Sequence, residues 1–403
     1  MRVLVITKMF PNAAEPLSAP FNRQQLGALG RRCEVEVLAT VPWFPGSRMV
    51  ARLAGRVPPP EVSATDRLEG LEVAHPRTLY LPRYGHALSA GLYALSVLPA
   101  VWRRRGRFDV VLGSWAYPDG VAAVALGRAL GLPVVVKLHG SDIDLLAKRP
   151  TLRWQLARAL PRAARVVAVS RALAADAASL GVDPTRIDVV PNGVDPSLFR
   201  PRARGEARAA LGHGADDRRW ILYVGRLQED KGVLDLAAAF AAWSAGRPGA
   251  NVALVMVGEG PARRSLQTAL APLGGRAILM GARPFDQVPL WMAAADLVTL
   301  PSHHEGTPNV LLEALACGRR VVATRVGGIP DVVHRAELGA LVPVGDVPAL
   351  AAALGAEIET DTETDADAAT VAALAARGGW DESAARLEAT LARAVAEGAA
   401  GVG

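Results

Sequence analysis

Two glutamates that stand eight positions apart, Glu305 and Glu313, are the residues whose types and spacing most clearly suggest chemistry in this sequence. The apolar run Leu297–Pro301 before them is typical of a buried strand, and we expect a helix after it. Thr307 is expected as the N-cap of this helix, and Pro308 as its first residue, where a missing N–H has no cost.

The start of the expected helix has the character of an anion site. The N–H groups of Asn309 and Val310 would be among the unpaired donors of the first turn, which attract a phosphate or a sugar oxygen. Glu313 is the only charged residue in the run Val310–Ala316, and a lone carboxylate in so apolar a helix is seldom buried without a partner. Two interpretations stay open from these residues: ligand-binding carboxylates, or a helix-dipole carboxylate at Glu305 and the exposed edge of a core helix at Glu313.

Basic residues near another strand end suggest a second part of the same site. In Trp220–Leu234 a strand leads through a turn into a helix, with Arg226 just past the strand and Lys231 at the helix start. A lysine there opposes the helix dipole, but a bound diphosphate would reverse the sign and draw both cations around it. Plain surface charges are the alternative.

Glycines and a histidine mark two further strand ends. Gly258 and Gly260 permit close backbone approach, but position 263 is arginine, so the GxGxxG dinucleotide fingerprint is incomplete. A Walker A motif is absent as well, and a nicotinamide cofactor is not expected. His139 stands at the C-terminal end of a strand, where a ligand-facing role and a structural role are both open.

The elements that must position these residues form two series of apolar, strand-length runs, mostly separated by alanine-rich segments of helix length. Continuous apolar strands that alternate with helices indicate α/β architecture, with parallel sheets covered on both faces. We expect ligands beyond the C-terminal ends of the strands, in the cleft between two doubly wound, Rossmann-like domains. The expected strands are Val3–Thr7, Val35–Thr40, Val110–Trp115, Val134–His139, Val166–Ser170, Ile187–Pro191, Ile221–Gly225, Val252–Gly258, Ala277–Gly281, Leu297–Pro301, Val321–Arg325 and Ala340–Val344.

A chain of 403 residues is too long for one typical core. The proline-rich, aperiodic segment Asp195–Arg204 is the expected interdomain linker. The predicted domains are residues 1–196 and 197–379, followed by a helical segment at 380–403. The acidic stretch Glu357–Asp367 is expected to be a solvated loop or helix face.

The composition indicates a cytoplasmic protein. Cys33 and Cys317 lack metal-ligand spacing, which is cysteine usage for a reducing compartment. No stretch approaches the ~20 apolar residues of a membrane span, and Met1–Thr7 is too short for a signal peptide. The net charge of +6 is scattered, so nucleic acid is not an expected partner. Neither half has an acidic cluster suited to a divalent metal, so no metal cofactor is expected.

Taken together, these motifs resemble the large family 4 of retaining glycosyltransferases with the GT-B fold. The resemblance covers nearly the whole chain, and its C-terminal half is the more specific. The matching elements are His139-Gly-Ser-Asp142, Val190–Asp195, Gly225-Arg226 with Lys231-Gly232, Gly258-Glu-Gly-Pro261, the EX7E element from Glu305 to Glu313, and Val326–Asp331.

The resemblance implies a role for each matching side chain. Arg226 and Lys231 would hold the diphosphate of a nucleotide-sugar donor, Glu313 the ribose hydroxyls and Glu305 the hydroxyls of the donor sugar. His139 would contact the transferred sugar from the opposite domain, and the C-terminal helix would cross back onto the first domain. The other implied donor-site residues are Gly258, Ala282, Arg283, Gly306, Thr307, Asn309 and Val310.

One loop departs from the family pattern. Many members have a Gly-Gly loop after the first strand, whereas Phe10–Gln24 contains no glycine, as in a subset that acts on cell-surface polysaccharides. Ser114–Gly120 also fits that subset, so Trp115, Tyr117 and Asp119 would line the acceptor side; a structural turn is the alternative.

The implied reaction is transfer of a hexosyl unit from a UDP- or GDP-sugar to a hydroxyl of a glycan, lipid-linked or small-molecule acceptor, with retention by front-face departure. A GT-B-fold sugar-nucleotide epimerase and a non-catalytic sugar-nucleotide-binding protein are the alternatives. The helix Leu88–Trp102, followed by four arginines, is either core or a peripheral contact with an anionic membrane at the inner face of the plasma membrane. The sugar, base, acceptor and oligomeric state are not determined by the sequence.

Overall fold

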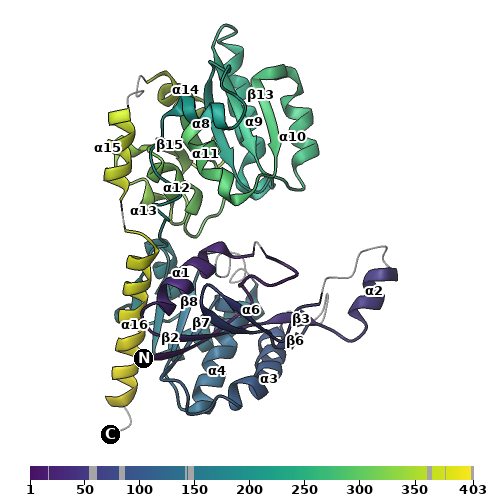
Figure 1. The fold of residues 1–403 in the computed structure, drawn as a ribbon, viewed down its shortest axis with the longest axis vertical. Coiled ribbons are helices and arrows are strands. Elements are labelled where there is room, and N and C mark those ends of the chain that lie inside the picture. Colours follow the sequence, from purple (N-terminus) through teal and green to yellow (C-terminus); the bar gives the residue numbers. More distant parts are fainter. Residues whose placement is uncertain are drawn as a thin grey trace. The chain divides into compact units, whose positions relative to one another are not determined.

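The computed structural model describes residues 1–16, 18–53, 61–80, 87–140, 143, 149–360, 365–376 and 378–400. The chain forms two compact units (Figure 1). The first comprises residues 1–192 together with the C-terminal segment from residue 380, and the second comprises residues 193–379. The sequence places the first boundary after residue 196, and the structure places it after Asn192.

The first unit is built on an eight-stranded sheet with the order β10-β9-β8-β7-β1-β2-β5-β4, and a parallel pair, β3 and β6, lies outside it. Its only antiparallel pairing among the described residues joins β4 to β5. The strands are β1 (Arg2–Thr7), β2 (Glu34–Ala39), β3 (Val41–Trp43), β4 (Thr65–Leu68), β5 (Leu71–Ala74), β6 (Arg77–Leu79), β7 (Val110–Ser114), β8 (Val134–Leu138), β9 (Arg165–Ala168) and β10 (Ile187–Val189). The α-helices are α1 (Pro20–Gly30), α2 (Ser47–Leu53), α3 (Ser89–Trp102), α4 (Val121–Leu130), α6 (Pro150–Ala159), α7 (Arg171–Ser179) and α16 (Trp380–Ala400).

The second unit is built on a six-stranded sheet with the order β13-β12-β11-β14-β15-β16, in which every pairing is parallel. The strands are β11 (Arg219–Val224), β12 (Val252–Val257), β13 (Ala277–Gly281), β14 (Leu297–Leu300), β15 (Val321–Thr324) and β16 (Gly339–Val342). The α-helices are α8 (Arg204–Ala210), α9 (Val233–Ala245), α10 (Arg263–Leu270), α11 (Val288–Ala294), α12 (Asn309–Ala316), α13 (Ile329–Val332), α14 (Val347–Glu359) and α15 (Asp365–Ala375).

The strand prediction from apolar runs is confirmed. Every expected strand is present, with ends within two residues of the expected ones. The sequence did not predict β3, β4, β5 or β6. These strands are three or four residues long, and half of their positions are exposed, so no continuous apolar run marks them.

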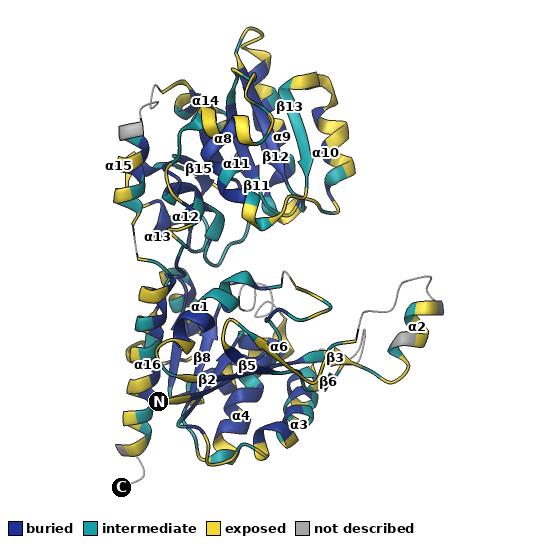
Figure 2. Ribbon diagram, viewed as in Figure 1, coloured by how far each residue is buried: buried dark blue, intermediate teal, exposed yellow. Residues whose placement is uncertain are grey.

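The last helix, α16, packs on the first unit although it follows the second unit in sequence (Figure 2). Its buried side chains recur at helical spacing and join the core beneath β1 and α1. Arg32 Nε bonds Glu388 Oε2 at 2.6 Å, and Gln25 Nε2 donates to Ser383 Oγ at 2.8 Å. The buried residues of this stripe are Trp380, Ala384, Leu387, Leu391 and Ala394.

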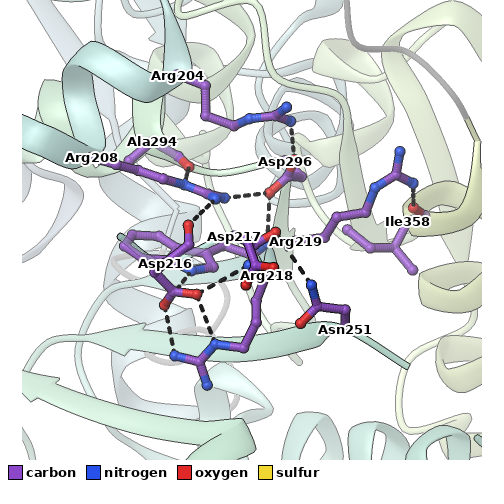
Figure 3. Close-up of polar contacts among 11 residues, drawn as sticks. Arg204, Arg208, Asp216, Asp217, Arg218, Arg219, Asn251, Ala294, Asp296 and Ile358 are labelled. Atoms are coloured by element: carbon purple, nitrogen blue, oxygen red, sulfur yellow. Dashed lines mark hydrogen bonds and ion pairs between the residues drawn. The ribbon is translucent and has the colours of Figure 1, made fainter. Parts of the chain in front are cut away.

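A cluster of ion pairs joins the beginnings of two strands in the second unit (Figure 3). Asp296, just before β14, accepts from Arg208 Nη2 at 2.8 Å and from the Trp220 backbone N–H of β11 at 2.6 Å. Arg204 also pairs with this carboxylate. The Arg208 and Asp296 side chains are only 8% exposed, so each charge requires the other. The cluster lies at the N-terminal ends of the strands, which indicates a structural role.

One expectation about loops is wrong, and a second needs correction at one residue. The predicted linker Asp195–Arg204 is packed on the second unit, because Phe199 is buried in that unit's core. In the acidic stretch Glu357–Asp367, Glu357 is not a solvated charge, since Arg320 holds its carboxylate through Nε at 2.7 Å and Nη2 at 3.0 Å. Residues 361–364 of that stretch lie outside the described residues.

Candidate active site

Two neighbouring parallel strands of the second unit, β11 and β14, bring the basic and acidic motifs together. Lys231 follows β11 and Glu305 follows β14, and Lys231 Nζ donates to Glu305 Oε1 at 2.7 Å. Ser302 Oγ donates to the same oxygen at 2.8 Å. The two side chains are largely shielded, so the pair is a defined feature of the site rather than a transient surface contact.

A glycine fixes the position of Lys231. Gly232 has φ 64°, and a Cβ at this position would lie 1.9 Å from the carbonyl oxygen of Pro301, at the end of β14. No side chain fits in that space, so the backbone after Lys231 can rest directly on the backbone that leads to Glu305. His303 adds a second tie, because its N–H donates to Asp230 O at 2.9 Å.

The loop after β15 supports Glu305 from the other side. Gly327 has φ 53°, and a Cβ there would lie 1.7 Å from the Glu305 carbonyl oxygen. The Gly328 N–H donates to Gly306 O at 2.9 Å. Gly327 of the Val326–Asp331 motif is therefore required for the close approach of this loop to Glu305.

Glu313, on α12, is a carboxyl group without a partner. Among the described residues, no hydrogen bond or ion pair to its side chain is found, and burial raises its pKa to about 7. Such a group is costly in the ionised form unless a ligand donates to it. A polar ligand with hydroxyl groups would satisfy it.

The start of α12 differs from the prediction. The helix begins at Asn309 with Pro308 as its N-cap, so Thr307 is not the cap and Pro308 is not the first helical residue. The reason is the backbone of Pro308, whose ψ of 85° is not helical. The Asn309 N–H donates to Thr307 O at 3.0 Å, so this donor already has an acceptor within the protein. Val310 N–H has no acceptor within the described chain and is the available donor of this turn.

Arg226 is an exposed cation at the end of β11. Its guanidinium has no hydrogen-bond or ion-pair partner in the described part of the chain, whereas its backbone oxygen accepts from Tyr223 Oη at 2.8 Å. The strand end is thus fixed while the charged group stays available. Arg226 and Lys231 are five residues apart on the same loop.

The remaining predicted donor residues lie at the ends of β12 and β13. Gly258 N–H donates to Gly281 O at 2.9 Å, and a Cβ on Gly258 would lie 1.8 Å from Gly225 O. Packing between neighbouring loops is therefore enough to explain this glycine. Ala282 and Arg283 are exposed, and the Arg283 guanidinium lies 5.7 Å from the centre of the Trp291 ring.

His139, at the end of β8 in the first unit, is held in one tautomer. Its Nε2 lies 3.0 Å from Ser114 Oγ, which donates to Asn22 Oδ1 at 3.0 Å. Asn22 Nδ2 donates to Met9 O at 2.7 Å, which fixes the orientation of the amide. Since the single Ser114 proton is used, Ser114 accepts from His139, and Nε2 carries the proton. Nδ1 is therefore the acceptor of the neutral ring.

Burial and the nearby Lys137 charge keep the pKa of His139 well below its usual value. The Trp115 ring stacks on the His139 ring with 5.6 Å between the ring centres, and the centre of the Phe21 ring lies 4.9 Å from that of His139. His139 is therefore neutral at physiological pH. The next residues of its motif, Ser141 and Asp142, lie outside the described residues.

Two of the three predicted acceptor-side residues are buried. Tyr117 is 4% exposed and Asp119 is fully buried, so neither side chain is placed to contact an acceptor. Asp119 Oδ1 accepts from the Lys8 N–H at 2.8 Å, and burial raises its pKa to about 6. This bond, together with Asn22, secures the glycine-free loop after β1. Trp115 is partly exposed, with Lys8 Nζ 5.8 Å from its ring centre.

Within the described ranges, no group of three or more His, Cys, Asp and Glu side chains could hold a metal ion. The same ranges contain no helix long and apolar enough to cross a bilayer. Metal independence stays a prediction.

Known proteins resemble this chain along both units. Residues 218–359 match the family described as Glycosyl transferases group 1, and residues 23–198 match Glycosyltransferase Family 4. The putative teichuronic acid biosynthesis glycosyltransferase TuaC of Bacillus subtilis is 30% identical over 82% of this chain and 83% of its own. The 2-deoxystreptamine N-acetyl-D-glucosaminyltransferase of Streptomyces fradiae is 34% identical over 66% of each chain.

Among solved structures, Anabaena HepE in complex with UDP is similar over 98% of this chain and 100% of its own, with a TM-score of 0.73 and 21% identity. The fold is that of a GT-B glycosyltransferase with two Rossmann-like domains. The chain belongs to glycosyltransferase family 4, and its activity is that of a hexosyltransferase. The family favours the transferase prediction over the epimerase and the non-catalytic binding protein.

Proposed function

We propose that the protein transfers a hexosyl unit from a UDP- or GDP-sugar to a hydroxyl of a glycan, lipid-linked or small-molecule acceptor, with retention of anomeric configuration. The observation that carries the proposal is the Lys231–Glu305 pair at the ends of β11 and β14, with the unpartnered Glu313 on the following helix. In this proposal one donor site contains the Lys231 cation, the sugar-binding carboxylate Glu305 and the ribose-binding carboxylate Glu313.

Lys231 has three N–H donors, and Glu305 uses one of them. The others are available for phosphate oxygens, so one ammonium group would hold the diphosphate and orient the carboxylate at the same time. Arg226 supplies a second cation, and Val310 N–H supplies a backbone donor. Glu313 accepts from the ribose hydroxyls, while Gly306, Thr307 and Asn309 lie beside the sugar.

The contacts of Glu305 support front-face departure, rather than double displacement, as the route of the proposed retention. Its Oε1 already accepts from Lys231 and Ser302, which makes the carboxylate a weak nucleophile. The main catalytic need is then stabilisation of the departing diphosphate by preset charges, which Arg226 and Lys231 meet. The leaving phosphate takes the proton of the acceptor hydroxyl.

The names of similar proteins support the substrate classes. HepE has been crystallised with UDP and with UDP-glucose, and the TuaC name refers to biosynthesis of a teichuronic acid. We propose a place in the cytoplasm and in polysaccharide biosynthesis, and peripheral contact with the inner face of the plasma membrane if the acceptor is lipid-linked. Trp115 is the predicted acceptor-side residue that remains accessible.

The test is a metal-free thermal-shift screen with UDP, GDP, ADP and their common sugar conjugates. One nucleotide series should raise the melting temperature of the wild type, and the shift should be lost in Glu313→Ala and Lys231→Ala. Arg264→Ala, at an exposed position on α10, is the matched control and should keep the shift. The anomeric configuration of the product, read by NMR, tests retention; an inverted product or no nucleotide shift would contradict the proposal.

A further inference from the structure

Helix α3 exposes an apolar face. Leu88, Leu95 and Trp102, spaced seven residues apart, are 62%, 68% and 51% exposed. The other exposed positions of the stripe are Gly91 and Pro99, so it carries no charged side chain, and its one polar side-chain group is the indole N–H of Trp102. The opposite face, with Tyr93 and Val97, is buried in the core of the first unit.

A helix at a water-facing surface normally presents polar side chains outward. A helix that is apolar on both faces is covered by protein or lies against lipid. The sequence left core and membrane contact open for this segment. The exposure of its outward stripe favours a second surface that covers it (Figure 2).

The charge around this stripe indicates what covers it. Arg103 and Arg105 follow the helix, are exposed, and have no carboxylate partner in the described chain. The Arg105 guanidinium lies 5.0 Å from the centre of the Trp102 ring. No aspartate or glutamate occurs between Leu79 and Phe108. An apolar stripe that ends in tryptophan and arginine matches the boundary between acyl chains and anionic headgroups.

Helix α6 extends the same surface. Gln155 Nε2 donates to Ala87 O, immediately before α3, at 2.8 Å. The adjacent Trp154 is 61% exposed, and the Arg158 guanidinium lies 5.0 Å from its ring centre. No acidic residue occurs between Leu145 and Ala175. Two neighbouring helices thus combine exposed apolar side chains with uncompensated positive charge.

We propose that a docking surface formed by Leu88, Leu95, Trp102, Trp154, Arg103 and Arg105 binds the first unit to an anionic lipid bilayer. This proposal deepens the proposed function, because it assigns the membrane contact to named residues and implies an acceptor presented at the bilayer surface. A second copy of the chain is the less favoured occupant. A symmetric dimer through this face would bring like charges together without acidic residues to balance them.

The test is co-sedimentation of the full-length protein with phosphatidylcholine vesicles that contain or lack phosphatidylglycerol, at low salt. The protein should bind the anionic vesicles only. Arg103→Glu/Arg105→Glu should lower the partition coefficient about 30-fold or more, since each arginine near an anionic leaflet contributes roughly fivefold. Leu95→Glu should lower it as well.

Two control variants separate these effects from net charge and hydrophobicity. Arg264→Glu/Arg335→Glu changes the charge equally at exposed positions of the second unit, and Val344→Glu replaces an exposed apolar side chain there. Both should bind like the wild type. The proposal would be overturned if the protein failed to bind anionic vesicles or bound neutral vesicles equally well. It would also be overturned if the wild type were a dimer that Leu95→Glu converts to a monomer. Nucleotide-induced thermal shifts, which need no membrane, keep this outcome separate from failure of the donor site.

Discussion

At the scale of single residues, Glu313 combines a cost to stability with a role in binding. Its pKa of about 7, against an ordinary 4.5, means that the folded protein favours the neutral carboxyl. Between these values the folded state holds a proton that the unfolded state has lost, so the free energy of unfolding falls as pH rises. Above pH 7 the free energy of unfolding has fallen by the full amount, which is roughly 3 kcal/mol.

Glu313→Gln removes this cost. We expect the variant to be more stable than the wild type at pH 8 and about equal at pH 4.5, as measured by urea denaturation. It should nevertheless bind the donor more weakly at pH 8, because ribose hydroxyls bond best to the ionised carboxylate. Wild-type donor affinity should rise between pH 5.5 and 8. Equal stability of the two proteins at both pH values would show that Glu313 has another partner.

Arg226 and Lys231 should matter chiefly for the diphosphate. Each charge-assisted bond contributes about 1.5–3 kcal/mol, so Arg226→Ala or Lys231→Ala should lower kcat/KM by on the order of 10–100-fold. The loss should be greater for Lys231→Ala, which also leaves Glu305 without its cation. Steady-state kinetics of both variants, with Arg264→Ala as control, check this; wild-type kcat/KM in Lys231→Ala would exclude the assigned role.

His139 should change tautomer without Ser114. In the wild type we expect the neutral ring with the proton on Nε2, visible in side-chain ¹⁵N NMR spectra at pH 7.5. Ser114→Ala removes this acceptor and should lower the fraction of rings that carry the proton on Nε2. A wild-type ring protonated on Nδ1 would show that the assignment is wrong.

At the scale of elements, the ion cluster around Asp296 connects α8, β11 and β14. Asp296→Ala leaves Arg208 buried without its carboxylate and should lower the free energy of unfolding by about 3–5 kcal/mol. Urea denaturation measures this loss. Asp217→Ala, at a neighbouring acidic residue outside the ion pairs, is the matched control. A loss below about 1 kcal/mol would mean that water reaches the cluster.

At the scale of the whole molecule, the reaction should need no metal ion. The charges that would stabilise the departing diphosphate are Arg226 and Lys231, and the described residues offer no metal-binding group. Transfer activity should therefore persist in excess EDTA. Complete loss in EDTA that Mg²⁺ restores would show that a cation bound with the donor takes part.

The sequence by itself determined the long parallel strands of both sheets and most of the candidate donor residues. Parallel strands that are buried on both faces are mostly apolar along their length, so β1 or β12 can be recognised without a structure. Chain order also predicts which residues follow strands, and hence that Arg226, Lys231 and Glu305 lie at strand ends. Local chemistry was enough for these inferences.

Only the tertiary structure decided what depends on contacts between distant segments. The Lys231–Glu305 bond joins residues on two neighbouring strands, and the His139 tautomer depends on Ser114 and Asn22 from other elements. Burial of Asp119 was equally invisible, because an aspartate in a turn is usually solvated. Pro308 shows the same limit locally: its backbone is set by the packed loop around Glu305 rather than by its own preference for a helix start.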